Sequence, residues 1–146
     1  MALTVRKILL WRREAPDAPG VGAATLEPFA KAGVDLKLVM GYRIHDGKAA
    51  VEVWPVTGRK VVAAAQGAGL AAATIHALLV EGDDRPGLGH AFARAIADAG
   101  ISLSFLVAMV VGRKFSSVFG FGTEADAKAA IPLLRKAGRP VKKGKR

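Results

Sequence analysis

The sequence repeats itself once, at a spacing of 67 residues. Residues 17–36 and residues 84–103 are identical at 9 of 20 aligned positions without a gap, whereas a composition this rich in alanine and glycine gives roughly 2 identities by chance. A chain of this kind is built from two copies of one supersecondary unit. We therefore expect a first module at residues 1–70, a second at residues 71–137, and a basic tail at residues 138–146.

Composition limits the class of protein. The chain has 146 residues, of which 51% are hydrophobic, and it contains no cysteine. The apolar content is enough for two small cores, and the lack of cysteine excludes disulfides and thiolate metal sites and favours the reducing cytoplasm. The longest apolar run, residues 103–111, is well short of the roughly 20 residues that span a bilayer, and the N-terminus lacks the pattern of a signal peptide. We expect a cytoplasmic protein without a membrane association.

Both repeats show the same order of hydrophobic patterns. Each opens with an apolar run of strand length, at residues 5–13 and 74–81, which ends in a cluster of Pro, Gly and Asp. Residues 20–32 and 87–99 then carry apolar side chains at helical spacing. An alternating strand, a short turn, a third strand and a second helix complete each copy. This order predicts an α+β fold, with helices on one face of an antiparallel sheet.

The repeat alignment extends to the third strand of each copy, where Trp54 aligns with Phe121. We expect these two rings to occupy equivalent core positions. Only one strand-like run, residues 70–81, lies between the copies, so we expect one long strand to end the first module and open the second. After the second module, residues 139–141 offer little material for a complete final strand.

The segment at residues 80–89 reads Val-Glu-Gly-Asp-Asp-Arg-Pro-Gly-Leu-Gly, and the helix that follows ends in Ala99-Gly100-Ile101. This pattern resembles the opening of an ACT domain, the small ferredoxin-like ligand-binding module of amino-acid metabolism. Residues 17–22, Asp-Ala-Pro-Gly-Val-Gly, match it more loosely. The resemblance covers nearly the whole chain and implies two tandem ferredoxin-like modules of βαββα(β) order.

The Pro-Gly-x-Gly turn is suited to anion binding. Proline fixes one dihedral angle, and glycine permits a tight turn from strand to helix that leaves backbone N–H groups uncovered. These groups and the helix dipole favour a carboxylate or phosphate, although glycines at such a place also serve a chain that only turns and packs. The dipole contributes about 0.3–1 kcal/mol, far less than the roughly 8 kcal/mol of micromolar binding. A ligand therefore needs further contacts, which favours a site at an interface between modules.

The resemblance implies a ligand site at the turn of each copy. Carried over by position, the residues are Asp84, Arg85, Gly87 and Leu88 in the second repeat and Asp17, Gly20 and Val21 in the first. We expect the ligand to be an amino acid, with Arg85 pairing with its carboxylate and Asp84 accepting from its ammonium group. Ala18 stands where the second repeat has Arg85, so the two sites are not expected to be equivalent.

The sequence shows no recognisable catalytic or metal-binding pattern. His45, His76 and His90 do not have the spacing of metal ligands. Asp83 and Asp84 have no nucleophile or base at a spacing that indicates acid–base chemistry. We therefore expect a protein that is not an enzyme and that holds no metal or cofactor.

The strand expected at residues 101–111 is apolar on both faces, whereas a sheet with helices on one side normally has polar residues on the other. The second face is therefore expected to be covered, either by the first module or by another chain. Edge-to-edge pairing is common among ACT modules, so the resemblance implies a homodimer or larger homo-oligomer. It also implies regulation of a metabolic enzyme or another regulator.

The net charge of +10 is concentrated at one end of the chain. Residues 135–146 carry +7 and residues 1–134 only +3. Two classes of function follow. The preferred one is a non-catalytic sensor that binds a small ligand at the Pro-Gly turns. The alternative is a nucleic-acid-binding ferredoxin-like module that uses the basic tail, and it is disfavoured because the third strands lack the basic-aromatic pattern of RNA-recognition modules.

Overall fold

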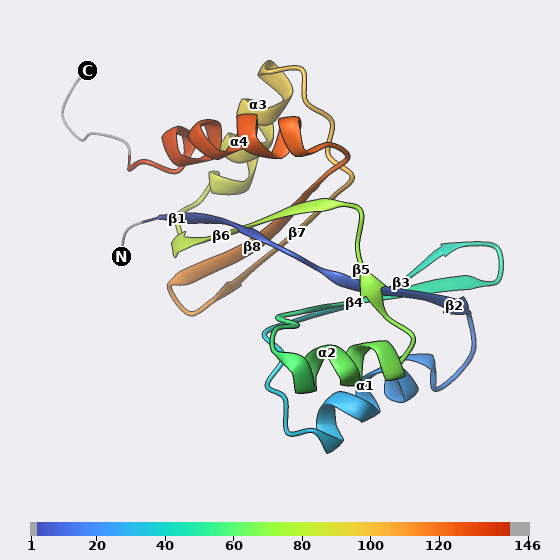
Figure 1. Cartoon of the computed structure of the whole chain (residues 1–146). Coiled ribbons are helices and arrows are strands. Elements are labelled where there is room, and N and C mark those ends of the chain that lie inside the picture. Colours follow the sequence, from blue (N-terminus) through green and yellow to red (C-terminus); the bar gives the residue numbers. More distant parts are fainter. Residues whose placement is uncertain (1–2, 141–146) are drawn as a thin grey trace, which may run out of the picture. The chain divides into compact units, whose positions relative to one another are not determined.

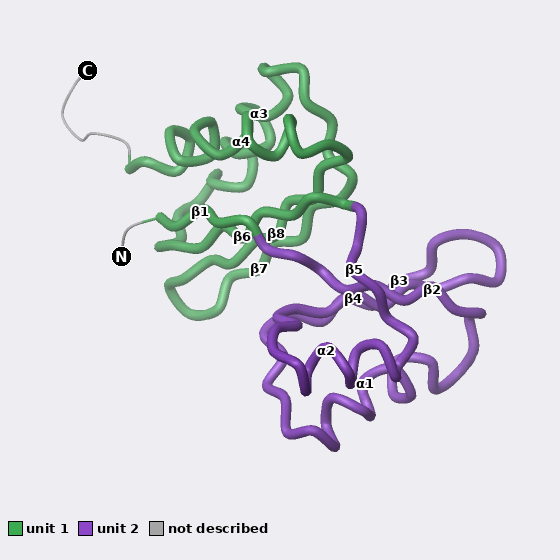
Figure 2. The backbone as a smooth tube through the Cα atoms, in the orientation of Figure 1, with its two compact units in different colours: residues 1–7, 75–146 green, residues 8–74 purple. Residues whose placement is uncertain are grey.

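A computed structural model describes residues 3–140 of the chain, which divide into two compact units (Figures 1 and 2). Among the described residues, unit 1 comprises residues 3–7 and 75–140, and unit 2 comprises residues 8–74. Within the described residues, each unit has a four-stranded sheet and two helices, which lie on one face of the sheet (Figure 1). This confirms the expected α+β class, with two ferredoxin-like modules built on antiparallel sheets.

Unit 2 follows the order of elements expected for the first repeat. Its elements are β2 (Trp11–Pro16), α1 (Val21–Lys31), β3 (Leu38–His45), β4 (Lys48–Trp54), α2 (Arg59–Gly67) and β5 (Ala71–Ala72). The strands lie side by side in the order β3-β4-β2-β5. The first strand of the repeat, β2, therefore lies inside the sheet, and β3 forms one edge.

Unit 1 has the same arrangement. Its elements are β1 (Thr4–Ile8), β6 (His76–Asp83), α3 (Leu88–Asp98), β7 (Phe105–Val111), β8 (Lys114–Phe121) and α4 (Glu124–Ala137), with the last residue of β1 assigned to unit 2. The strand order is β1-β6-β8-β7, so β7 is an edge strand like β3. None of the helices in residues 3–140 is long and apolar enough to cross a membrane.

Two apolar runs that look like single strands in the sequence are each divided between the two sheets. The run at residues 5–13 becomes β1 and β2, and the run at residues 70–81 becomes β5 and β6. The expectation of one long strand at residues 70–81 is therefore wrong. The physical reason is hydrogen bonding, because Ala71 and Ala72 pair with β2 while the residues from His76 onward pair with β8 in the other sheet. The N-terminal strand β1 completes the sheet of unit 1, so residues 3–7 belong with residues 75–140.

The gap-free alignment of the two repeats is displaced by one residue after the hairpin that joins β3 to β4 in unit 2 and β7 to β8 in unit 1. Leu38 pairs with Trp54, whereas Phe105, its equivalent in the repeat, pairs with Gly120. The additional residue of unit 2 appears as a bulge in the pairing of β3 with β4. Because neighbouring residues in a strand face opposite sides of the sheet, Phe121 is fully buried in the core while Trp54 is only partly buried. The expected equivalence of Trp54 and Phe121 is therefore wrong.

Each unit has its own hydrophobic core between the sheet and its helices. In unit 1 the ring of Phe92, on α3, lies 5.6 Å from the ring of Phe115 and 5.9 Å from that of Phe119, both on β8. Thr123 caps the N-terminus of α4, and its hydroxyl oxygen accepts a hydrogen bond from the backbone N–H of Asp126 at 3.1 Å. These contacts fix α3 and α4 over the sheet and thereby position the turn that precedes α3.

Candidate functional site

Both Pro-Gly segments form tight turns from strand to helix, as expected. Gly20 and Gly87 precede α1 and α3 with φ angles of 89° and 83°, in the left-handed region that favours glycine. In each turn the first helical N–H donates back across the turn, from Val21 to Ala18 and from Leu88 to Arg85, at 3.3 Å in both. No side chain among the described residues caps either helix, so the first backbone N–H groups of α1 and α3 are not covered by a capping side chain.

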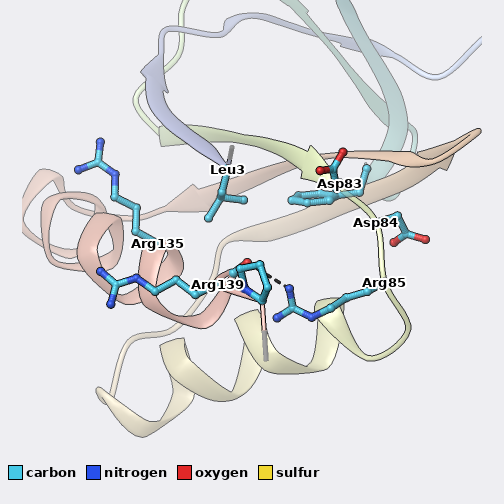
Figure 3. Close-up of a pocket in the computed structure, with 9 residues that line it drawn as sticks. Leu3, Asp83, Asp84, Arg85, Arg135 and Arg139 are labelled. Carbon is cyan, nitrogen blue, oxygen red and sulfur yellow. Dashed lines mark hydrogen bonds between the residues drawn. The ribbon is translucent and has the colours of Figure 1, made fainter. Parts of the chain in front are cut away.

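Two cavities flank the turn of unit 1. The arginine cavity has a volume of about 570 Å³ and is lined by Leu3, Asp83, Asp84, Arg85, Phe115, Arg135, Gly138, Arg139 and Pro140 (Figure 3). The apolar cavity has a volume of about 290 Å³ and is lined by Asp84, Leu88, Gly89, Phe92, Leu106, Ala108, Met109, Val110, Phe115, Ser117 and Phe119. Asp84 and Phe115 line both, so the two cavities are neighbours that share these residues.

The apolar cavity lies between the first turn of α3 and the strands β7 and β8. Leu88 is buried and contributes to the wall, and Gly89 leaves open space because nothing lies within 4 Å of where its Cβ would be. Asp84 is exposed at this cavity, and its backbone N–H donates to the carbonyl of Arg113 at 2.8 Å. The Ser117 hydroxyl donates to the carbonyl of Val80 at 3.0 Å. The cavity thus combines an apolar wall with one carboxylate at its rim.

Arg85 faces the other cavity. Its Nη1 donates to the carbonyl of Gly138 and its Nη2 to that of Ala137, both at 3.1 Å. These carbonyls stand at the C-terminal end of α4, where helices leave acceptors without an intrahelical partner. Asp84, Gly87 and Leu88 are thus gathered at the α3 turn and line the apolar cavity or lie beside it, while the Arg85 guanidinium bonds to the end of α4 and lines only the arginine cavity.

Asp83 forms an ion pair with Lys114 across the pairing of β6 with β8. The hydrogen bond from Lys114 is the largest of the effects that lower the pKa of Asp83 to about 2. The Asp83 side chain is therefore ionised at neutral pH, with its charge compensated at the wall of the arginine cavity.

The corresponding turn of unit 2 has different surroundings. Asp17 forms an ion pair with Arg43, whose Nε lies 2.7 Å from Oδ2 of Asp17. At the place of Phe92, the first repeat has Thr25, which is fully buried, accepts from Arg13 Nη1 at 2.8 Å and donates to the carbonyl of Val21 at 2.8 Å. The turn that carries Asp17, Gly20 and Val21 is therefore polar, unlike the turn of unit 1.

A polar cluster around the buried Glu52 side chain joins three strands of unit 2. The Tyr42 hydroxyl donates to Oε2 of Glu52 at 2.7 Å, and Arg12 Nη1 donates to the Tyr42 oxygen at 2.6 Å. Glu52 is fully buried. Burial, assisted by the Glu52 carboxylate, raises the pKa of Tyr42 above its usual value. These contacts tie β2, β3 and β4 together.

Apart from Asp84, Arg85 and Leu88, sequence reasoning did not identify the residues that line the two cavities. Residues of β7 and β8 and the arginines at the end of α4 come next to the turn only through the tertiary fold. For β7 the sequence held a signal, because alternate residues of a strand share one face of the sheet. This places Leu106, Ala108 and Val110 together, and all three line the apolar cavity. Nothing local to Arg135 or Arg139 indicates a cavity. Among residues 3–140 there is no cluster of three or more potential metal ligands.

Neither a known protein-family model nor a curated protein matches the sequence. Solved structures do match the fold. The ligand-free regulatory subunit of aspartate kinase from Thermus thermophilus is similar with a TM-score of 0.63, covering 95% of this chain and 98% of that one at 15% identity. A protein from Bacteroides thetaiotaomicron has a TM-score of 0.70 over 88% of each chain at 10% identity.

A third match is aspartokinase III from E. coli, in complex with aspartate and ADP. The TM-score is 0.59 at 10% identity, and the alignment covers 94% of this chain but 33% of that one. At identities this low, the structural similarity establishes a shared fold and nothing more. In each case the shared fold extends over nearly all of the present chain. The chain therefore has the fold of a tandem ACT-domain protein, with two ferredoxin-like modules.

Proposed function

We propose that the chain is a non-catalytic regulator that binds a single amino acid at the turn before α3. The observation that carries this proposal is the apolar cavity, which has the Asp84 carboxylate at its rim and the start of α3 in its wall. Its volume of about 290 Å³ is at the small end of ligand pockets, which are usually about 300–1,000 Å³. That size suits one amino acid better than a nucleotide.

The lining assigns a role to each part of the ligand. Asp84 accepts from the ammonium group. The backbone N–H groups of Gly89 and His90 receive the carboxylate at the positive end of α3, since the N–H groups of Leu88 and Ala91 already donate to the carbonyls of Arg85 and Gly87. Leu88, Phe92 and Met109 surround the side chain. Because this wall is apolar, the favoured ligand has an aliphatic or thioether side chain, and a charged side chain is disfavoured by the cost of its desolvation.

We further propose that a second copy of the chain covers the cavity. β7 is an edge strand, and Met109, Val110 and Val111 are 59%, 54% and 71% exposed. An edge strand with exposed apolar side chains invites pairing with another chain. A homodimer formed there supplies the contacts that one helix terminus lacks, since the dipole alone contributes only about 0.3–1 kcal/mol.

The turn of unit 2, with Asp17, Gly20 and Val21, is proposed as a second and weaker site. The ion pair between Asp17 and Arg43 competes with the ammonium group of a ligand for the Asp17 carboxylate. Arg85 supports the unit 1 site indirectly, by fixing the loop between Asp84 and Gly87 to the end of α4. The two sites are therefore expected to differ in affinity.

The similarity to regulatory subunits of aspartate kinase supports a regulatory role, and we propose that ligand binding alters association with a metabolic enzyme or another regulator in the cytoplasm. A coupling free energy of about 1–3 kcal/mol is typical of such control. This is sufficient to change the affinity for a partner severalfold to about a hundredfold.

A thermal-shift screen of the common amino acids and nucleotides tests the proposal. A ligand at 100 times its dissociation constant stabilises the folded chain by about 2.7 kcal/mol, which is readily measured. The expected result is stabilisation by one or a few apolar amino acids, reduced in Leu88→Ala, which opens the wall, and retained in Val61→Ala, which removes methyl groups from α2 of the other unit.

The same screen with RNA tests the nucleic-acid alternative. The basic tail at residues 138–146 lies outside the described residues from position 141 onward, so the comparison uses the full chain and a chain that ends at Pro140. The sensor proposal is wrong if three results occur together: RNA stabilises the full chain, RNA does not stabilise the shortened chain, and no amino acid stabilises either chain.

A further inference from the structure

Gly89 is a glycine that the fold of unit 1 does not require. It is the second residue of α3, and its φ angle is not positive, unlike that of Gly87 just before the helix. An alanine therefore adopts the same backbone conformation without strain. Nothing lies within 4 Å of the position that a Cβ atom of Gly89 would take, so close packing does not exclude a side chain either.

Glycine at such a position lowers the stability of the fold. Replacing glycine by alanine where both fit the backbone usually stabilises a protein, because the unfolded chain then has less conformational freedom to lose. The first repeat carries Gly22 at the same position of its helix, where φ is also not positive and the space around the Cβ position is also open. The two copies thus share a glycine that neither backbone geometry nor packing explains.

The position of Gly89 in the apolar cavity offers an explanation. Gly89 lines this cavity together with Asp84, Leu88 and Phe92. Leu88 and Phe92 are buried, whereas Gly89 and Asp84 are exposed, so Gly89 belongs with Asp84 to the accessible part of the cavity. Glycine is the usual residue where a ligand approaches the backbone closely, because it has no Cβ atom.

We propose that Gly89 determines the affinity of the apolar cavity for amino acids, because its missing side chain lets the head group of the ligand reach the backbone at the start of α3. This inference rests on the proposed function and adds a residue that positions the ligand. The head group consists of the ammonium and carboxylate groups that all amino acids share, and it lies beside Asp84 and the N–H groups of Gly89 and His90. A methyl group on residue 89 takes up the space that the head group needs. The resulting loss of affinity is therefore nearly the same for every amino acid that binds.

Titration calorimetry of leucine, methionine and valine with the full chain and with Gly89→Ala tests this inference, together with thermal unfolding of both proteins. The melting temperature of unit 1 is expected to rise by roughly 2–8 °C in the variant. All the ligands that bind the unmodified chain are expected to bind the variant at least about tenfold more weakly. Tenfold corresponds to about 1.4 kcal/mol, which is within the usual cost of adding a methyl group to space that is already filled.

Gly67→Ala is the matched control. Gly67 is the last residue of α2, its φ angle is not positive, and nothing lies within 4 Å of its Cβ position. It belongs to unit 2 and does not line the apolar cavity. This variant is expected to be at least as stable as the unmodified chain and to bind the same ligands with unchanged affinity. A glycine with a purely structural role cannot give higher stability together with weaker binding when it is replaced, so the two measurements separate the two roles.

Three results overturn the inference while leaving the proposed function intact. Equal affinity of Gly89→Ala and the unmodified chain shows that the ligand does not use this space. A lower melting temperature of Gly89→Ala shows that the glycine serves the fold. A loss of affinity for one ligand but not for another shows contact with the ligand's side chain instead of its head group. If none of the amino acids binds the unmodified chain, the proposed function fails and this inference fails with it.

Discussion

Replacing Arg85 by methionine tests whether this residue holds the fold or the ligand. The substitution keeps an unbranched apolar stem and removes both hydrogen bonds to the end of α4, each 3.1 Å long. Hydrogen bonds from a charged donor contribute about 1.5–3 kcal/mol each, and partial exposure of Arg85 reduces this to about 1 kcal/mol each. We therefore expect the free energy of unfolding of unit 1 to fall by about 2 kcal/mol. In a domain of this size the melting temperature then falls by roughly 8–16 °C.

Urea unfolding followed by circular dichroism measures this loss, with Arg94→Met as the matched control. Arg94 forms an exposed ion pair with Asp98 on the same unit, which is worth only about 0.3–0.5 kcal/mol. If Arg85→Met is no more destabilising than Arg94→Met, the structural role of Arg85 is refuted. If the variant is as stable as the unmodified chain but no longer binds an amino acid, Arg85 contacts the ligand as the family resemblance implies.

Three further predictions concern stability and are measured by chemical unfolding. Gly120→Ala places a methyl group 2.1 Å from Cε2 of the Phe105 ring, so we expect a loss of about 1–3 kcal/mol; an unchanged stability contradicts this packing. Gly22→Ala lies in α1 with open space around its Cβ position and is expected to stabilise by about 0.5 kcal/mol, whereas destabilisation indicates a contact that the structure lacks. The hydrogen bond from Lys114 is the largest of the effects that lower the pKa of Asp83 from its usual 3.8 to about 2. The ionised carboxylate therefore stabilises the fold above about pH 4 and loses this effect as the pH falls toward 2. The difference in stability between the unmodified chain and Asp83→Asn is expected to shrink over that range. A difference that stays constant contradicts the stabilising role of the ionised Asp83.

The order of elements was predictable because it depends on local patterns. Helical spacing followed by a glycine identifies α1 and α3, and the Pro-Gly segments before Val21 and Leu88 form the expected turns, with Gly20 and Gly87 at positive φ. A duplicated pattern also strengthens each individual interpretation, since one unit checks the other. The fold class therefore follows from the sequence alone.

Which strands pair with one another was not predictable in the same way. The apolar runs at residues 5–13 and 70–81 each supply strands to two sheets, and nothing in their composition marks the break. Hydrogen-bond partners distant in sequence decide where such a run divides. An alignment without gaps also cannot show the one-residue bulge in unit 2. Because of this extra residue, β4 residues such as Trp54 lie on the opposite face of the sheet from the one that the alignment predicts.

The candidate site was predictable only where it lies within the turn. Asp84, Gly87 and Leu88 are close in sequence and are found together in the structure. Arg85 is the fourth residue predicted for this site, but its long side chain reaches Ala137 and Gly138, more than fifty residues away in the sequence. Which acceptors such a side chain finds depends on the packing of α4, and this information is not local.

Titration calorimetry of an apolar amino acid, such as leucine or methionine, tests the central claim most directly. The comparison uses the unmodified chain, Asp84→Asn at the rim of the apolar cavity, and Asp98→Asn at the far end of α3 as a charge-matched control. The account predicts binding to the unmodified chain, at least about tenfold weaker binding to Asp84→Asn because a charged hydrogen bond is lost, and unchanged binding to Asp98→Asn. Absence of binding by every common amino acid, or equal binding to the unmodified chain and Asp84→Asn, contradicts it.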